Sequence, residues 1–348
     1  MAIMKEINKY IEIGHDRFLS ELMEFLEIPS ISSQIERKGD VERCARWLAN
    51  HIESIGISDV KIIETAGNPI VYGEWLGAGI EAPTVLLYGH YDVQPVDPLN
   101  LWHSDPFKPR ISGGKLFGRG TADDKGQVFC HLKAIEAFFK TKGTLPVNLK
   151  LLIEGEEEAM ASHIDEFVEQ NAEMLYCDAI IISDTEWFDE GIPSICYGLR
   201  GISFAELTVY GPNRDLHSGS FGGAIDNPLN VLCKMIASLT DAYGRITIPG
   251  FYDDVLELTG SEREGFAQLP YNEKDYINGL GIKGVNGEYG FTTLERVWAR
   301  PSLDLNGIWG GYTGEGSKTI LPSKATAKIS MRLVPNQNAQ DIAKKIKQ

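Results

Sequence analysis

Two stretches within the first sixty residues repeat apolar side chains at the spacing of a helix face. Polar residues fill the positions between them, so each stretch predicts an amphipathic helix that packs on a core. We interpret both helices as scaffold. The apolar positions are Phe18, Leu19, Leu22, Phe25 and Leu26 in the first stretch and Val41, Cys44, Trp47, Leu48, Ile52 and Ile55 in the second.

Three later runs are apolar at nearly every position rather than at alternate ones. Residues 85–88, 149–153 and 179–182 show this pattern, which is typical of strands covered on both faces in a parallel sheet. Between the first two runs, apolar side chains share one face of a helix predicted from about residue 125 to residue 140. Strands that alternate with helices predict an α/β fold with a mostly parallel sheet flanked by helices.

After about Tyr197 the pattern becomes that of a sheet with one solvated face. Residues 203–209 and 325–333 alternate apolar and polar side chains, and a helix is predicted after Asn227 and Pro228. A polar helix is predicted to end the chain. This second part is interpreted as a smaller α+β domain, so we divide the chain into domains 1–199 and 200–348.

The composition is that of a globular protein with a large acidic excess. The chain has 348 residues, of which 43% are hydrophobic and 24% are charged, which argues against disorder. Its formal net charge of −16 repels phosphate groups, so we expect no nucleic-acid partner and no membrane partner. No apolar run approaches the roughly 18 residues of a membrane span. Five widely spaced cysteines predict neither a disulfide framework nor a thiolate zinc site, and we expect a cytoplasmic protein.

Side chains of the types that bind metals lie next to each apolar run. Because the carboxyl ends of parallel strands meet at one edge of a sheet, these side chains can converge although they are distant in sequence. One imidazole among several carboxylates suits zinc, or manganese or cobalt in its place, and a carboxylate can bridge two ions. The residues are His90 and Asp92 after the first run, Asp123 and Asp124 before the 125–140 helix, Glu156–Glu158 after the second run and Asp184 after the third.

Each of these residues also has a simpler structural explanation when it is taken alone. Asp123 and Asp124 could cap the helix, the glutamates could form a solvated face, and Asp184 could begin a turn. Their joint occurrence at strand ends favours a metal site and metal-assisted hydrolysis. Nucleophilic chemistry is disfavoured, because Cys130 and His131 adjoin within a helix and point apart.

Seven short segments, taken in order, form a more specific pattern. They are residues 89–95 (GHYDVQP), 118–126 (GRGTADDKG), 154–158 (EGEEE), 182–184 (ISD), 197–201 (YGLRG), 215–219 (DLHSG) and 332–335 (RLVP). Together they resemble the co-catalytic zinc exopeptidases, which include cytosolic non-specific dipeptidase, carnosinase, aminoacylase, succinyl-diaminopimelate desuccinylase and glutamate-releasing carboxypeptidase. The resemblance runs from about residue 15 to the end of the chain, and it is strongest for the dipeptidase branch.

The resemblance implies a pair of zinc ions held by the clustered residues. His90, Asp123 and Asp184 would hold one ion. Asp123 and Glu158 would hold the other, together with a second histidine. The peptide bond between Asp123 and Asp124 would be cis, as it usually is in the family.

The resemblance also implies roles around the metals. Asp92 would orient His90, and Glu157 would act as general acid and base. His217 would reach the active site of a partner subunit and polarise the scissile carbonyl, while Arg332 and Thr319 would hold the terminal carboxylate of the substrate. Residues 200–348 would then form an inserted lid and dimerisation domain of a homodimer.

The expected activity is hydrolysis of the amide bond of dipeptides or short peptides. The alternatives are an N-acyl amino acid deacylase of the same family, or a catalytically inactive fragment that acts only in dimerisation and metal binding. Two departures from the family pattern bear on this expectation. Residues 159–162 replace a usual Gly-Ser pair, so the roles of Glu156, Glu157 and Glu158 could slip by one position. Family members also continue for roughly another hundred residues, so the chain is expected to be truncated, with the 200–348 domain incomplete.

Overall fold

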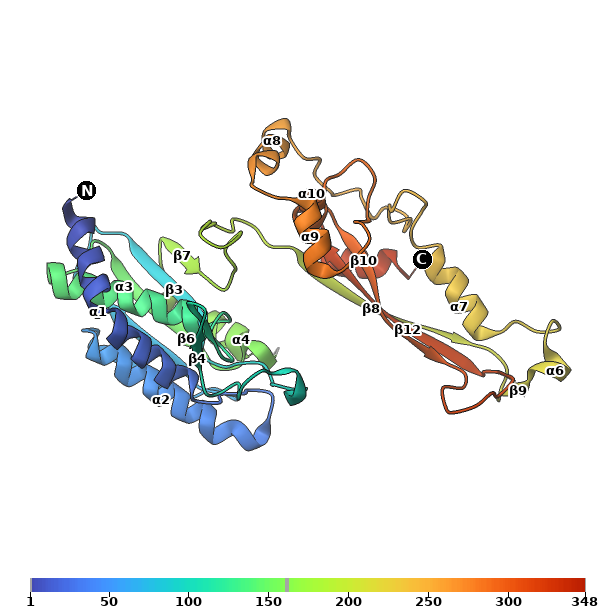
Figure 1. The fold of residues 1–348 in the computed structure, drawn as a ribbon, viewed down its shortest axis with the longest axis horizontal. Coiled ribbons are helices and arrows are strands. Elements are labelled where there is room, and N and C mark those ends of the chain that lie inside the picture. Colours follow the sequence, from blue (N-terminus) through green and yellow to red (C-terminus); the bar gives the residue numbers. More distant parts are fainter. Residues whose placement is uncertain (1, 160–162, 348) are drawn as a thin grey trace. The chain divides into compact units, whose positions relative to one another are not determined.

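The computed structural model describes residues 2–159 and 163–347. The chain forms two compact units, Met1–Ile195 and Cys196–Gln348, each with its own sheet (Figure 1). No helix in the described ranges is both long enough and apolar enough to cross a bilayer.

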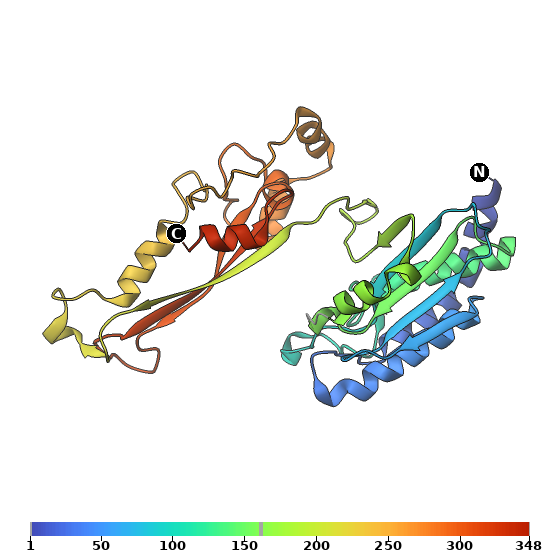
Figure 2. The ribbon, with the colours of Figure 1, turned by 180° about the vertical axis from the view of Figure 1, so that it is seen from behind.

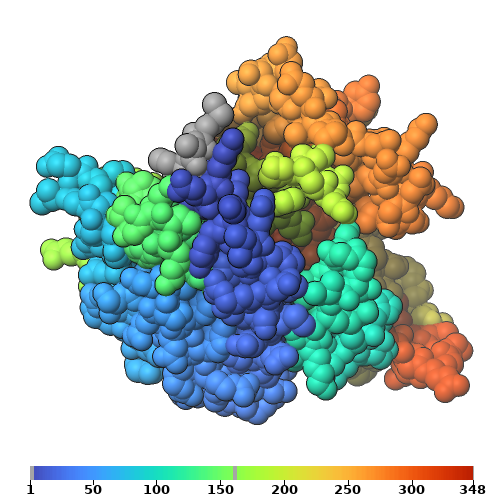
Figure 3. All heavy atoms as spheres, turned by 60° about the vertical axis from the view of Figure 1, so that its left-hand side comes forward, coloured from blue at the N-terminus to red at the C-terminus, as the bar shows by residue number. Residues whose placement is uncertain are grey.

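Three long helices of the first unit match those predicted from the apolar spacing. They are α1 (Ala2–Leu26), α2 (Lys38–Ser54) and α3 (Lys125–Lys142). Helix α3 ends at Gly143, whose left-handed backbone, with a φ of 71°, is a conformation that favours glycine at a helix end. In the space-filling view of Figure 3, the dark blue α1 lies on the surface of this unit beside the lighter blue of α2.

The sheet of the first unit is mixed. In its described part the strand order is β1 (Asp59–Ile63), β2 (Ile70–Trp75), β6 (Asn148–Glu154), β3 (Thr84–His90) and β7 (Ala179–Ile182). Strands β6, β3 and β7 run parallel, whereas β1 and β2 pair antiparallel to their neighbours. The α/β class is therefore confirmed, and the three strands that carry the candidate chemistry are the parallel ones.

Helices cover both faces of this sheet. On one face α1, α2 and α3 pack on alternate strand residues, among them Val71, Leu87 and Leu151. On the other face α4 (His163–Gln170) and α5 (Ala172–Leu175) pack on the intervening residues, such as Tyr72 and Leu152. Figure 1 shows the side of the sheet that carries α1 and α2, and Figure 2 shows the side that carries α4.

One part of the prediction for this sheet is wrong. The apolar run 179–182 was predicted to be covered on both faces, yet Ile180, Ile181 and Ile182 are 60%, 41% and 55% exposed. The physical reason is position: β7 is the edge strand, and the helices that bury β3 and β6 do not extend over it.

The second unit has a twisted antiparallel sheet with the strand order β10 (Ser302–Gly310), β12 (Lys324–Leu333) and β8 (Gly201–Tyr210). Two helices, α7 (Pro228–Ala237) and α11 (Ala339–Lys345), pack on it and bury the apolar positions of β12. Asn227 begins α7 by accepting a hydrogen bond from the backbone N–H of Leu229 at 2.9 Å. The predicted strands 203–209 and 325–333 and the helix after Asn227 are confirmed.

Short elements complete both units. A two-stranded ladder joins β9 (Leu216–His217) to β11 (Ile320–Leu321). The remaining elements are η1 (Ile35–Arg37), η2 (Leu99–Leu101), β4 (Arg110–Ser112), β5 (Lys115–Phe117), η3 (Glu157–Ala159), α6 (Ser218–Phe221), α8 (Gly260–Gln268), α9 (Glu273–Leu280) and α10 (Thr293–Trp298).

Candidate metal centre

Three of the predicted ligands meet at the carboxyl end of the parallel strands. His90 is the last residue of β3, Asp184 follows the end of β7 by two residues, and Asp123 lies two residues before α3. His90 Nε2 lies 3.2 Å from Asp123 Oδ1 and 3.5 Å from Asp184 Oδ2. One ligand atom from each of the three residues lies within 4.8 Å of the others, which is close enough for one metal ion to bind all three.

The imidazole of His90 fits a role as a metal ligand. Its side chain is fully buried, and its Nε2 atom has no hydrogen-bond partner in the described structure. A buried polar atom without a partner is costly, so this nitrogen needs a ligand at the point where the two carboxylates face it. Burial would lower the pKa of His90, but Asp184 and Asp92 outweigh it and raise the pKa to about 12. The negative charge around this imidazole therefore favours a cation.

Asp92 links two of the candidate ligands. Its Oδ1 atom lies 3.3 Å from His90 Nδ1, and its Oδ2 atom accepts a hydrogen bond of 3.1 Å from the backbone N–H of Glu158. The hydrogen bond of His90 Nδ1 is made to the backbone carbonyl oxygen of Asp92 at 3.1 Å, and Oδ1 has no hydrogen-bond partner among the described residues. An oxygen in this position fixes the tautomer and the ring orientation of a metal-binding histidine. Asp92 is fully buried, so it holds this geometry away from solvent.

Asp124 does not act as the helix cap that its position allows. It occupies the N-cap position of α3, but its side chain makes no capping hydrogen bond there. Instead, Asp124 Oδ2 accepts a hydrogen bond of 3.1 Å from the backbone N–H of His90. Burial raises the pKa of Asp124 to about 7. The peptide bond between Asp123 and Asp124 is cis, as the resemblance implied.

The three glutamates after β6 differ in their surroundings. Glu156 is buried and accepts hydrogen bonds from the backbone N–H of Asn68, at 2.7 Å, and from His163. Glu157 is the most exposed of the three glutamates. Partial loss of hydration, together with the nearby carboxylates of Asp184 and Asp92, raises the pKa of its carboxyl group. Glu158 accepts a hydrogen bond of 2.5 Å from Gln94 and lies outside the His90 cluster. Because Glu156 is already hydrogen-bonded to Asn68 and His163, the structure gives no reason to shift the proposed roles of Glu157 and Glu158 by one position. Residues 160–162 of the unusual 159–162 segment lie outside the described residues.

In the second unit the structure brings the predicted catalytic residue His217 and the predicted substrate-binding residue Thr319 together and separates Arg332 from them. His217 in β9 is exposed and pairs with Ile320, the residue after Thr319. Arg332 is exposed near the opposite end of β12. The eight steps along the strand from Lys324 to Arg332 span roughly 26 Å at about 3.3 Å per residue. Thr319 and Arg332 therefore do not meet within one chain.

Several supporting residues were not predicted from the sequence. Lys125, at the start of α3, is fully buried and donates hydrogen bonds to the carbonyl oxygens of Phe25, at 3.0 Å, and Ile28, at 2.7 Å. It thereby ties the segment that carries Asp123 to the end of α1. Gln94 likewise holds Glu158. Both residues lie within the segments that carry the family resemblance, which is the only sequence signal that could have singled them out.

A buried histidine that faces carboxylates at the carboxyl end of parallel strands fits the metal site of an α/β protein, and such sites serve metal-dependent hydrolysis. A family model for "Peptidase family M20/M25/M40" matches residues 86–335. The chain belongs to this peptidase family, and the recognition made from the sequence is confirmed.

Individual relatives agree with this assignment. The chain is 33% identical to the Cys-Gly metallodipeptidase dug1 of Schizosaccharomyces pombe over 99% of its own length and 75% of that protein. It is also 33% identical to the human Beta-Ala-His dipeptidase, over 99% of this chain and 71% of that one. Among solved structures, the M20 family metallo-carboxypeptidase Sso-CP2 of Sulfolobus solfataricus superposes with a TM-score of 0.82 at 36% identity, covering 95% of this chain and 74% of that chain.

Proposed function

We propose that this metallopeptidase hydrolyses the amide bond of dipeptides or short peptides with the help of two divalent metal ions. The observation that carries the proposal is the buried, unpartnered Nε2 of His90 facing the carboxylates of Asp123 and Asp184. Relatives that align over nearly the whole chain are named dipeptidases, which supports this substrate class. An N-acyl amino acid deacylase of the same family is the competing activity.

The donor set supports zinc as the metal, with manganese or cobalt as substitutes. His90, Asp123 and Asp184 would hold one ion, and Asp123 and Glu158 would contribute to the second. When bound, the ions would polarise the substrate carbonyl and make water easier to deprotonate. The backbone carbonyl of Asp92 keeps His90 oriented for this role through a contact of 3.1 Å with Nδ1, and the Asp92 carboxylate lies 3.3 Å from the same nitrogen.

Glu157 is the proposed general acid and base. Its carboxylate takes a proton from the attacking water as the new carbon–oxygen bond forms. It then returns that proton to the nitrogen as the carbon–nitrogen bond breaks. The second proton of the water passes from the new carboxylic acid to the amine, so the products are a carboxylate and an ammonium group. Its raised pKa supports this exchange, because it makes the carboxylate a stronger base towards water and moves its pKa closer to the pH at which a group can both accept and release a proton.

We also propose a cytoplasmic homodimer in which residues 200–348 form the lid and dimerisation domain and residues 1–199 the catalytic domain. His217 of one subunit would polarise the carbonyl bound to the other. Because Thr319 lies beside His217, it would enter the same site with it. Arg332, which lies apart from both, would supply the guanidinium for the substrate carboxylate from the other end of β12.

The test is a substitution that removes the acid–base group without removing metal ligands. Glu157→Gln should abolish hydrolysis of a dipeptide panel, while metal content, measured by elemental analysis after loading with Zn²⁺, stays as in the wild type. Glu166→Gln, an exposed change in α4, is the matched control and should retain activity. Faster hydrolysis of acetylated or succinylated amino acids than of free dipeptides would establish the deacylase instead. Full activity of Glu157→Gln would contradict the role of Glu157.

A further inference from the structure

Helix α3 makes a second contact with the metal-site edge of the sheet, through a residue that the proposed mechanism does not use. His131 Nε2 lies 2.7 Å from Ser183 Oγ, which makes a hydrogen bond between α3 and the segment after β7. Ser183 directly precedes Asp184, one of the three clustered metal ligands. The sequence pattern had drawn attention to His131 only as the neighbour of Cys130, and that pair does not form a reactive site.

The two contacts of α3 come from one face of the helix. Asp124, just before the helix, and His131 are seven residues apart, which is about two turns, so they point to the same side. Asp124 holds the end of β3 through the backbone N–H of His90, and His131 holds the exit of β7 through Ser183. One face of the helix is therefore hydrogen-bonded to the ends of two neighbouring parallel strands, β3 and β7.

The packing between these contacts is close. A Cβ atom added at Gly89 in β3 would lie 2.5 Å from Val128 Cγ2 and 2.7 Å from Asp124 Oδ2. Val128 lies between Asp124 and His131 in the sequence of α3, and it is buried. The helix therefore packs directly on β3. Its position determines where the side chain of His131 contacts the segment after β7.

The exit of β7 needs such an anchor. The strand pairs with β3 only through the register Val85↔Ala179 to Tyr88↔Ile182, and its isoleucines are exposed. Ser183 and Asp184 lie beyond the last pair of this ladder, so the sheet does not fix their backbone. Their other contacts are local: the carbonyl of Ser183 accepts a hydrogen bond of 2.7 Å from the backbone N–H of Thr185, and Asp184 faces His90.

We propose that His131 is a positioning residue that holds Asp184 in place for metal binding through its hydrogen bond to Ser183. This inference rests on the proposed metal centre. The contact lies one residue away from the ligand, so it acts on Asp184 through the backbone that the two neighbouring residues share. Burial lowers the pKa of His131, which favours a neutral imidazole able to make one directed hydrogen bond to the hydroxyl group.

The test measures metal affinity rather than activity. Wild-type protein is stripped of metal and titrated with Zn²⁺ against a chromophoric chelator, and Co²⁺ absorption reports the ligand geometry. His131→Ala should weaken metal binding by about 10-fold to 100-fold and change the Co²⁺ spectrum. His131→Gln places an amide near the position of Nε2 and should restore most of the affinity.

Ser183→Ala should reproduce the loss, and the double variant His131→Ala/Ser183→Ala should be no weaker than either single variant, because both remove the same hydrogen bond. Cys130→Ala, the adjacent change on the same helix, is the control and should bind Zn²⁺ as the wild type does. Thermal unfolding of each metal-free variant separates a loss of folding from a loss of affinity. Wild-type affinity in His131→Ala would overturn the inference, whereas a wild type that binds no Zn²⁺ would overturn the proposed metal centre itself.

Discussion

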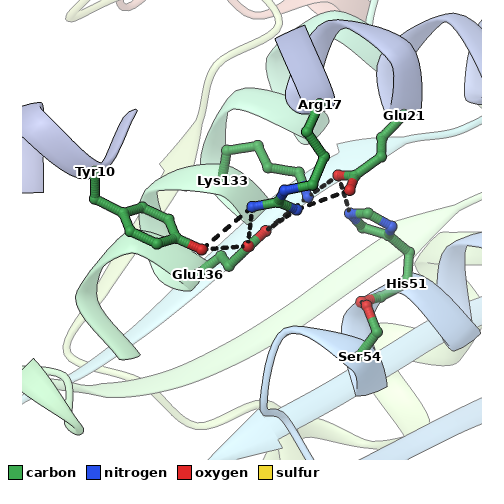
Figure 4. Close-up of polar contacts among 7 residues, drawn as sticks. All are labelled: Tyr10, Arg17, Glu21, His51, Ser54, Lys133 and Glu136. Carbon is green, nitrogen blue, oxygen red and sulfur yellow. Dashed lines mark hydrogen bonds and ion pairs between the residues drawn. The ribbon is translucent and has the colours of Figure 1, made fainter. Parts of the chain in front are cut away.

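Removing the charge of Glu136 should destabilise the first unit by about 3 kcal/mol. Glu136 lies on α3 at the centre of a polar cluster that joins this helix to α1 (Figure 4). Its carboxylate is only 5% exposed and accepts hydrogen bonds from Arg17 at 2.5 Å, Lys133 at 2.8 Å and Tyr10 at 2.8 Å. Glu136→Gln keeps the size of the side chain and removes the charge that these donors surround.

The size of the effect follows from the pKa of Glu136. Burial alone would raise this pKa, but the hydrogen bonds from Arg17, Lys133 and Tyr10 outweigh it and lower the pKa from 4.5 to about 2. At about 1.4 kcal/mol per pKa unit, this corresponds to roughly 3 kcal/mol of stabilisation of the folded state. Removing one partner of a buried ion pair costs about 3–5 kcal/mol. We expect the lower end, because Glu21 also pairs with Lys133 and Arg17 is 46% exposed.

The pH dependence provides a second, independent signature. Because folding lowers the pKa of Glu136, its stabilisation is fully present above about pH 4.5 and is lost as the pH falls towards 2. Urea unfolding is followed by tryptophan fluorescence, to which Trp47 contributes where it stacks on Phe25. The difference in the free energy of unfolding between wild type and Glu136→Gln should be large at pH 7 and smaller at pH 3. Glu24→Gln, an exposed change on α1, is the control and should shift stability by less than about 0.5 kcal/mol. A difference below about 1 kcal/mol at pH 7, or a difference that does not change with pH, would refute this reasoning.

Two further substitutions test the site more directly. Asp92→Asn should weaken Zn²⁺ binding about 10-fold to 100-fold, because it removes the negative charge 3.3 Å from His90 Nδ1 while the backbone carbonyl of Asp92 still contacts this nitrogen; unchanged affinity in a chelator competition would show that this carboxylate is not needed. Gly89→Ala should destabilise the protein by about 1–3 kcal/mol in urea unfolding, because the added methyl group would lie 2.5 Å from Val128 Cγ2. Wild-type stability in Gly89→Ala would mean that α3 can move away from β3 without cost.

The sequence was sufficient to predict that three of the four candidate metal ligands, His90, Asp123 and Asp184, lie together. Continuous apolar runs identified β3 and β6 as buried strands, and the shared carboxyl edge of a parallel sheet then brought His90 and Asp184 together although they are 94 positions apart. The helical spacing similarly predicted α3, which begins just after Asp124. These features depend on local periodicity and on one topological rule, which a single sequence contains.

Other features depend on neighbours that the sequence does not reveal. The exposure of Ile181 was not predictable, because an apolar run shows that a strand can be buried and not which elements reach it. Strands β1 and β2 were not predicted, and their antiparallel pairing makes the sheet mixed. The hydrogen bonds of Glu156 to Asn68 and of Glu158 to Gln94 join residues 88 and 64 positions apart. Only tertiary structure could distinguish the three consecutive glutamates in this way.

Different parts of helix α3 contribute to the stability of the first unit and to the geometry of its metal site. Its N-terminal half holds the site through Asp124 and His131, and its C-terminal half holds α1 through Glu136. Asp124 and Glu136 are twelve positions apart, which is about 18 Å along a helix, and the hydrogen bonds of the Glu136 carboxylate go to Arg17, Lys133 and Tyr10 rather than to residues of the metal site. Loss of the Glu136 charge should therefore leave Zn²⁺ affinity unchanged in the folded protein. Loss of the His131 contact, two turns from Asp124, should lower that affinity with little effect on urea unfolding, because the apolar face of α3 that packs on the sheet stays intact.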